Sequence, residues 1–317
     1  MSLQFIIGSS GIGKTHYACQ RIIQESMENP GKLYYIIVPE QFTMQTQKNV
    51  VEMHPGKGIL NIDVLSFQRL AYRVFEEVGG AREVLLDDTG KSLVLQKLVQ
   101  QHKKELPYLG SQMNKPGYLD EVKSLISEFM QYDIRQEELS DMLEKTGEDS
   151  LLQMKMNDVS VLYQAFTDYL EGHYMTGEGV MDALKKAIPF SRKLKNSVLL
   201  LDGFTGFTPV QMNVIRELLA VCDQVLVTVT MDVKENPLQM GKPHQLFYMS
   251  RKMIHTLSGL INDLDDPVYL KEEKKGRFSD APALGFLEQH LFRYRKAAYG
   301  KSQDEIRIFA AESPIKE

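Results

Sequence analysis

The chain has 317 residues, of which 43% are hydrophobic and 25% are charged, and its formal net charge at pH 7 is −5. This composition is ordinary for a globular protein, and the length is sufficient for one large α/β domain or two smaller domains. The small negative charge gives no general attraction to nucleic acid, so contact with DNA would need a local basic groove. No apolar run is long enough to span a membrane and no signal peptide precedes the first strand pattern, so we expect a cytoplasmic protein without membrane contact.

Residues 1–80 alternate between strand and helix patterns. Three apolar runs, which begin at Leu3, Lys32 and Gly58, are typical of buried strands, and helical spacing of apolar residues follows them. The last of these helices is expected to stop at Gly79 and Gly80. Strands interleaved with helices in this way predict an α/β fold with a parallel sheet and right-handed crossovers.

From 81 to 195 the pattern is helical throughout, and we find no strand pattern there. Strand patterns return at 196–204 and 224–231, a helix is expected at 244–261, and a final strand is expected at 305–317. The organisation predicted is an α/β part at 1–80, an all-helical insertion at 81–195, and a return to the α/β core and start of the next segment at 196–317.

The stretch between the first strand and the first helix fits the pattern G-x-x-x-x-G-K-[ST] of a phosphate-binding loop. In such a loop, glycines let backbone N–H groups curl around a phosphate, the lysine reaches the β and γ phosphates, and the Thr hydroxyl ligates Mg²⁺. A glycine turn that only joins a strand to a helix is the alternative. The predicted nucleotide-binding residues are Gly8, Ser9, Ser10, Gly11, Ile12, Gly13, Lys14 and Thr15, with ATP and Mg²⁺ as ligands.

An acid follows the apolar run "VLLL", at Asp202. The carboxyl end of a parallel strand is where ligands bind in an open α/β sheet, so we predict that Asp202 supports Mg²⁺ together with Thr15. Asp202 as the cap of the following turn is the alternative. The next residue is Gly203, whereas motor ATPases usually carry a Glu there to position the attacking water. The sequence therefore favours nucleotide binding without fast hydrolysis.

The sequence shows no ligand spacing for a structural metal. Cys19 and Cys222 are far apart in apolar surroundings and are expected to be buried free thiols. The seven histidines have no metal-ligand spacing. The stretch from Lys271 to Arg277, "KEEKKGR", carries charges of both signs and is typical of a solvated loop.

Four stretches, in this order and spacing, carry a resemblance to a known family: "IIGSSGIGKT", "VPEQFTMQTQ", "VLSFQRLAYRVFEEVGG" and "LLLDGFTGFTPVQ". Together they resemble the N-terminal region of the AddB (RexB) family, the B subunits of bacterial ATP-dependent helicase–nucleases that process double-strand breaks for recombination. The resemblance implies an AddA-type helicase–nuclease partner. It also implies that a nuclease domain and an iron–sulfur cluster lie beyond Glu317, so that this chain is an N-terminal fragment.

This region of the family is similar to the first motor domain of superfamily 1 helicases. "LSFQRLA" matches a helicase segment that touches single-stranded DNA, and "DGFTGFTPVQ" matches a second motif at Asp202 and Gln211. The second motif departs from the helicase pattern at Gly203, Thr205 and Gly206. The resemblance therefore implies a P-loop NTPase fold of the RecA and superfamily 1 type whose motor is degenerate. Such a subunit would hold and scan a DNA strand, including for the Chi sequence, while AddA drives translocation.

The loops at the carboxyl ends of the predicted strands carry polar and aromatic side chains that suit unpaired DNA. Two alternatives stay open, namely Phe204 and Phe207 as packing anchors instead of stacking faces, and Arg69 as the partner of a local acid. The predicted DNA-binding residues are Gln41, Thr43, Ser66, Phe67, Gln68, Arg69, Phe204 and Phe207.

Two other functions compete with this interpretation. A free-standing P-loop kinase of a small metabolite would use the insertion at 81–195 as a lid, but no compact lid with paired arginines is visible. A protein-interaction module with a vestigial phosphate loop would differ from the helicase-like function only in that it no longer binds nucleotide. Binding of single-stranded DNA that weakens with salt favours the helicase-like function, whereas phosphoryl transfer to a small molecule favours the kinase.

Overall fold

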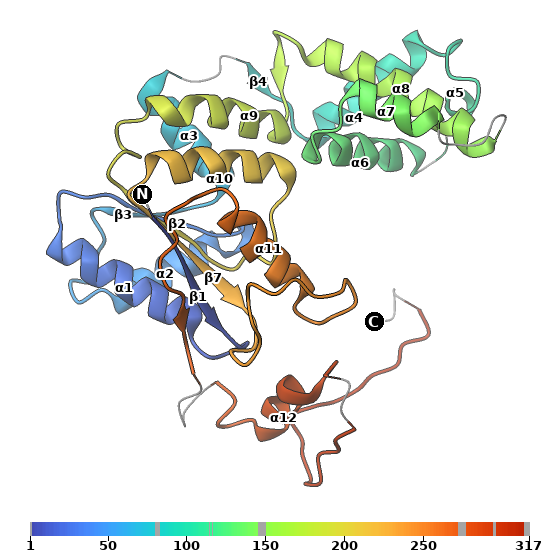
Figure 1. Ribbon diagram of the computed structural model, residues 1–317. Helices are drawn as coiled ribbons and strands as arrows, with labels where there is room; N and C mark the ends of the chain where they lie inside the picture. The colour runs from blue at the N-terminus through green and yellow to red at the C-terminus, as the bar shows by residue number, and fades with distance from the viewer. Residues whose placement is uncertain are drawn as a thin grey trace. The chain divides into compact units, whose positions relative to one another are not determined.

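The computed structural model describes residues 2–79, 83–113, 115, 117–144, 150–271, 277–293 and 296–313. The chain forms two compact units, and each is described by itself (Figure 1). The first, the sheet unit, comprises Met1–Val64, Asn196–Gly206 and Cys222–Glu317. The second, the helical unit, comprises Leu65–Lys195 and Phe207–Val221.

The sheet unit is built on a six-stranded sheet with the strand order β3-β2-β6-β7-β1-β8. The pairings β2–β6, β6–β7, β7–β1 and β1–β8 are all parallel, which confirms the predicted α/β class. The strands are β1 (Ser2–Gly8), β2 (Tyr34–Ile37), β3 (Ile62–Leu65), β6 (Val198–Leu201), β7 (Gln224–Thr230) and β8 (Val268–Tyr269). The helices of this unit are α1 (Lys14–Glu28), η1 (Glu40–Phe42), α2 (Thr43–Met53), α11 (Tyr248–Ser258) and α12 (Pro282–His290).

The inner strands are apolar on both faces because both faces of the sheet are covered. Every residue of β2 and of β6 is buried, as continuous apolar runs of a parallel sheet predict. On one face, α1 and α2 pack against the strands (Figure 1). Ile22 of α1, Val50 of α2 and Ile36 of β2 meet in this core and are fully buried. This packing holds α1 in place, and α1 begins at the end of the phosphate-loop sequence.

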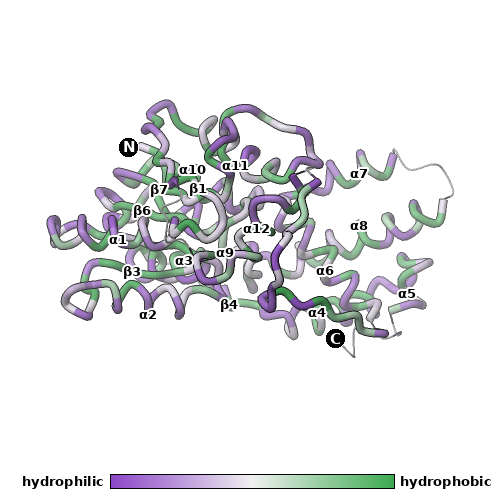
Figure 2. Tube along the Cα trace, turned by 90° about the horizontal axis from the view of Figure 1, so that it is seen from below, coloured by the Kyte–Doolittle hydropathy of each residue, from purple (hydrophilic) through white to green (hydrophobic). Residues whose placement is uncertain are grey.

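The helical unit contains α3 (Phe67–Val78), β4 (Val84–Leu85), α4 (Asp88–Gln101), α5 (Leu109–Gln112), α6 (Tyr118–Gln131), α7 (Gln136–Glu144), α8 (Leu151–Leu170), β5 (Tyr174–Met175), α9 (Gly177–Ala187), η2 (Ile188–Phe190) and α10 (Pro209–Val221). Its core joins α4, α6 and α8 through side chains such as Leu95, Ile126 and Phe166. Figure 2 shows hydrophobic and hydrophilic residues alternating along these helices, as expected of amphipathic helices. The helices α3 and α10 lie in segments that were predicted to belong to the α/β core, but they belong to the helical unit.

Two sequence predictions of strands need correction. The region 81–195, predicted to lack strands, contains the parallel two-residue pair β4–β5. The final strand predicted at 305–317 is wrong, since the described residues 305–313 form no strand, and 314–317 lie outside the described residues. Conversely, β8 was not predicted: it pairs Val268 with Ile6 and Tyr269 with Ile7. The short strands were missed because two residues are too few to show a periodic pattern. The strand at 305–317 was predicted from an alternating apolar pattern, but such a pattern forms a strand only where a partner strand is available.

The stretch predicted as a solvated loop is described only at its two ends. Lys271 and Arg277 are both exposed, and 272–276 lie outside the described residues. Across the ranges given above, no helix combines the length and the apolar content that crossing a membrane requires.

Candidate nucleotide-binding site

The phosphate-loop sequence folds as a turn between the end of β1 and the start of α1. Gly8 closes β1 and Lys14 opens α1. Gly13 caps the helix with φ 95° and ψ 25°, a left-handed conformation that L side chains rarely adopt. Because Gly13 has no side chain, no side-chain hydrogen bond caps the first turn of α1. Backbone N–H groups at such a helix start attract anions, so the local geometry suits a phosphate.

Lys14 is held against its own loop. Its Nζ donates to the backbone oxygen of Ser9 at 2.8 Å. Burial lowers the pKa of Lys14 below its usual range, while the nearby carboxylates of Asp202 and Glu288 act in the opposite direction. A partly desolvated ammonium attracts a phosphate more strongly than an ammonium in bulk water does, because screening is weaker.

Asp202 lies next to the loop although it is far from it in sequence. It follows β6, is 5% exposed, and accepts hydrogen bonds from Thr15 Oγ1 at 3.1 and 2.9 Å. Thr228 Oγ1 on β7 donates to the same carboxylate at 2.6 Å. The fold thus brings together the two side chains predicted to hold Mg²⁺. A hydroxyl and a carboxylate are oxygen donors of the kind that Mg²⁺ prefers, so the donor set fits this ion.

Thr228 is a member of this group that the sequence did not predict. Threonine is common in strands, so its place within the apolar run of β7 carried no functional signal. Only the pairing of β7 between β1 and β6 places its hydroxyl beside Asp202.

Gly203 has a backbone conformation that matches its missing side chain. Its φ is +80°, in the left-handed region, and its N–H donates to Thr228 Oγ1 at 3.4 Å. A Glu at this position would be strained. The backbone therefore disfavours the water-positioning acid that a motor ATPase carries there.

A pocket of 630 Å³ opens over this group. Its walls come from the loop, α1, α2, the segment after β6, β7 and one residue beyond β8. Among its lining residues are Gly11, Gly13, Lys14, Thr15, Asp202, Thr228 and Arg277. All of them belong to the sheet unit.

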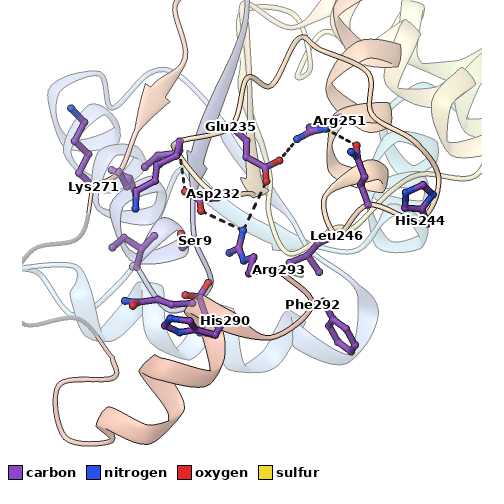
Figure 3. A pocket seen from close by; sticks show the side chains of 17 residues that line it. Ser9, Asp232, Glu235, His244, Leu246, Arg251, Lys271, His290, Phe292 and Arg293 are labelled. Atoms are coloured by element: carbon purple, nitrogen blue, oxygen red, sulfur yellow. Dashed lines mark hydrogen bonds and ion pairs between the residues drawn. The ribbon is translucent and has the colours of Figure 1, made fainter. Parts of the chain in front are cut away.

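A larger pocket of 1220 Å³ also includes the loop residues Ser9 and Ile12 in its wall (Figure 3). Four of its charged side chains form a bonded group. Arg293 lies 3.3 Å from Asp232 and 4.0 Å from Glu235, and Arg251 donates to Glu235. Lys14, Thr15 and Asp202 line the smaller pocket and not this one, so the smaller pocket suits the phosphates of a nucleotide better.

Of the predicted DNA-binding residues, Gln41, Thr43 and Phe204 belong to the sheet unit. Gln41 is exposed in η1, and Phe204 is half-buried in the wall of the 630 Å³ pocket. Thr43 is buried, and its hydroxyl donates to the backbone oxygen of Glu40 at 2.9 Å. Gln41 and Phe204 therefore have accessible surface, whereas the Thr43 hydroxyl bonds within the protein.

The other predicted DNA-binding residues belong to the helical unit. Ser66 is buried and caps α3, where its side chain accepts from the Arg69 N–H at 3.3 Å. Gln68 and Arg69 are exposed. Phe207 is half-buried, and its ring meets the Phe67 ring edge to face, with centroids 6.3 Å apart. The first turn of α3 thus carries two exposed polar side chains next to Phe67, one member of this aromatic pair.

Within the ranges that the structure covers, no group of three or more His, Cys, Asp or Glu side chains is arranged to hold a metal ion. Cys19 and Cys222 are both buried and free.

Comparison with known proteins gives a consistent result. The family model described as "ADDB, N-terminal" matches residues 5–288. A protein from Lachnoclostridium phytofermentans, named as the B subunit of an ATP-dependent helicase/deoxyribonuclease, is 42% identical over 324 residues, which cover 100% of this chain and 28% of that protein. A protein of the same name from Clostridium novyi is 31% identical, and the match covers 100% of this chain and 28% of that protein. A third, from Clostridium acetobutylicum, is 32% identical, and the match covers 98% of this chain and 27% of that protein. The chain thus spans little more than a quarter of the length of these relatives. By these matches, the chain belongs to the AddB N-terminal family.

Proposed function

We propose that this chain binds a nucleoside triphosphate, with ATP and Mg²⁺ as its ligands, through the loop from Gly8 to Thr15. The observation that carries the proposal is the contact between Thr15 and Asp202, which assembles a magnesium donor pair beside Lys14. Lys14 would bind the β and γ phosphates, and the amides of the loop and of the first turn of α1 would bind the remaining phosphate oxygens.

The same site supports binding better than rapid hydrolysis. A motor ATPase needs a group that orients the attacking water, and Gly203 holds a conformation that disfavours any side chain. We therefore propose that the nucleotide acts as a structural or regulatory ligand of this chain, without driving movement.

The wider role that we propose rests on family membership. The relatives are named as subunits of an ATP-dependent helicase/deoxyribonuclease. We propose that this region serves the B subunit of such an enzyme in the cytoplasm, with an AddA-type partner, during the repair of DNA double-strand breaks by recombination. In this role it would hold and scan single-stranded DNA, including for the Chi sequence. The exposed polar side chains of Gln41 in the sheet unit and of Gln68 and Arg69 in the helical unit support this role, since such side chains can contact DNA.

The test is a titration of Mg·ATP and of a non-hydrolysable analogue against the purified chain, with turnover followed in the same samples, with and without single-stranded DNA. We expect binding with negligible turnover. Lys14→Ala should lose measurable binding, whereas Lys104→Ala, at an exposed lysine of the helical unit, should bind like the wild type.

Other outcomes would point elsewhere. Unchanged binding by Lys14→Ala would contradict the phosphate-loop assignment. Turnover stimulated by DNA would show that another residue positions water and that the motor is intact. Phosphoryl transfer to a small molecule, without DNA binding, would support the metabolite kinase.

A further inference from the structure

Arg277 lines the nucleotide pocket although it lies in a stretch that the sequence marks as a solvated loop. It is among the lining residues of the 630 Å³ pocket, together with Gly11, Gly13 and Lys14 of the phosphate loop. The chain reaches this place after β8, more than two hundred and fifty residues beyond the loop, so no sequence motif links the two. Only the fold shows that a second long cationic side chain shares the pocket with Lys14.

The neighbouring residue, Phe278, fixes this part of the chain against the loop. A Cβ placed on Gly11 would lie 3.0 Å from Phe278 Cε2 and 3.3 Å from the Arg277 Cβ, so the two segments are in direct contact. On its other side Phe278 packs on α12, where a Cβ on Gly285 would lie 3.1 Å from the Phe278 Cβ. The ring is therefore held between two glycines, and it anchors the Arg277 backbone at the edge of the pocket.

The segment that follows is tied to the rest of the sheet unit. The Ala281 N–H donates to the Phe278 backbone oxygen at 3.2 Å, in the turn that leads into α12. Beyond α12, Arg293 bonds to Asp232 at 3.3 Å and lies over the Phe247 ring at 4.8 Å. These contacts on both sides of α12 position Arg277 through packing, before any ligand binds.

The charge of the pocket calls for a second cation. A nucleoside triphosphate with Mg²⁺ keeps net negative charge, and Lys14 supplies one positive charge. Arg277 makes no ion pair with any residue in the part of the chain that the structure describes, and its side chain is exposed. A guanidinium presents several N–H donors in a planar fork that matches phosphate oxygens, so it is well suited to this contact.

We propose that Arg277 donates hydrogen bonds to the phosphate chain of the nucleotide bound at the loop, as a second cation beside Lys14. The proposal rests on the proposed nucleotide binding. It concerns the phosphates and not the base, because Arg277 shares the pocket with Lys14, Thr15 and Asp202. Nucleotide binding would then also hold the start of the 277–293 segment against the loop.

The test measures the affinity for Mg·ATP and, by competition, for inorganic tripolyphosphate, which has no base or ribose. The wild type is compared with Arg277→Gln, Arg277→Lys and Arg307→Gln, the last being an exposed arginine with the same change in charge. Arg277→Gln should weaken both ligands by roughly tenfold or more, the loss expected for one charge-assisted hydrogen bond. Arg277→Lys should retain part of the affinity, and Arg307→Gln should retain all of it.

The outcomes separate this proposal from the one that it rests on. If the wild type binds ATP and Arg277→Gln binds it equally well, the role of Arg277 is wrong while nucleotide binding stands. If Arg277→Gln loses ATP but keeps tripolyphosphate, the side chain contacts the nucleoside and the phosphate role is overturned. If the folded wild type binds neither ligand, nucleotide binding itself is wrong, and this proposal falls with it. Because Arg277 is exposed, thermal melting should show that its variants fold normally.

Discussion

Thr15 and Asp202 meet through the Thr15 hydroxyl, which donates to both carboxylate oxygens at 3.1 and 2.9 Å across 187 residues of sequence. Each side chain alone has an ordinary structural explanation: a threonine opening a helix, and an aspartate after a strand. Their contact beside Lys14 is the geometry that a magnesium-nucleotide site requires. It is therefore the natural place to test the site.

Asp202→Asn should lower the affinity for Mg·ATP by roughly 10- to 100-fold, as expected when a group that supports a metal loses its charge. The asparagine keeps an oxygen for Thr15 and Thr228, so the fold should persist. Affinity for ATP measured in EDTA should change little. Asp223→Asn, just before β7 and paired with Lys32, is the matched control. An equal loss with and without Mg²⁺ would mean that Asp202 shapes the loop and does not support the metal.

Phe207→Ala should weaken binding of a labelled single-stranded oligonucleotide by about 1–3 kcal/mol, the value of one base–aromatic stacking contact. The ring is half-buried and meets the Phe67 ring edge to face, so part of its surface is accessible to a base. Phe190→Ala, at a phenylalanine of the same unit that is 74% exposed, should leave the affinity unchanged. A lowered melting temperature with unaltered affinity for the oligonucleotide would show that Phe207 is a packing anchor.

Cys19 and Cys222 should resist alkylation while the protein is folded. Burial raises the pKa of the Cys19 thiol to about 12, with the Asp202 carboxylate adding to the effect, and burial raises the pKa of Cys222 to about 11. The reactive thiolate is therefore scarce at pH 8, and its fraction in the folded protein should grow only as pH approaches these values. Iodoacetamide labelling followed by mass spectrometry should modify both residues in urea and neither in buffer. Fast labelling of Cys19 in buffer would contradict its burial.

Lys91→Met should lower the free energy of unfolding by about 3–5 kcal/mol, because it leaves the Glu178 carboxylate buried without its cation. The two charged groups are 3.1 Å apart, with side chains only 8% and 10% exposed. Urea denaturation measures the loss, and Lys186→Met on exposed α9 surface is the control. Replacing both partners, as Lys91→Met with Glu178→Leu, should recover part of the stability. A single variant as stable as the wild type would show that the pair contributes nothing.

The same pair predicts a dependence on pH. Burial alone would raise the pKa of Glu178, but hydrogen bonds and Lys91 outweigh it and hold the pKa below its usual range. A depressed carboxyl pKa stabilises the folded state above the unfolded value of about 4.3. The contribution is lost as pH falls through the lower folded value. The difference in stability between the wild type and Glu178→Gln should therefore shrink below about pH 4.

The turn that joins β1 to α1 could be predicted because its residues are contiguous in the sequence. Gly8, Lys14 and Thr15 lie in one short motif between a clear strand and a clear helix. Asp202 could be predicted from the apolar run before it, since the carboxyl ends of parallel strands meet at one edge of the sheet. The positions of Thr228 and Arg277 at the pocket could not be predicted, because a threonine in a strand and an arginine in a mixed-charge loop look ordinary until pairing and packing place them.

The wrong strand predictions also arose because strand pairing is not visible in the sequence. The predicted strand at 305–317 alternates well, but a strand needs a neighbour, and the sequence does not show which edge is available. β4, β5 and β8 are each only two residues long, so tertiary contacts, and not a sequence pattern, decide whether they pair. The assignment of α3 and α10 to one unit depends on packing between segments that lie far apart in the chain.

The strand order also sets the timing of folding during synthesis. β1 is made first, but its neighbours in the sheet are β7 and β8, so residues 9 to 223 must be made before Ser2 can pair with Gln224. At ordinary rates of chain elongation, this delay lasts on the order of 10–40 seconds. Throughout that time, the apolar first strand and the loop behind it have no place in the sheet. A nascent chain that stops short of β7 therefore lacks the strand that pairs with β1 beside the phosphate loop.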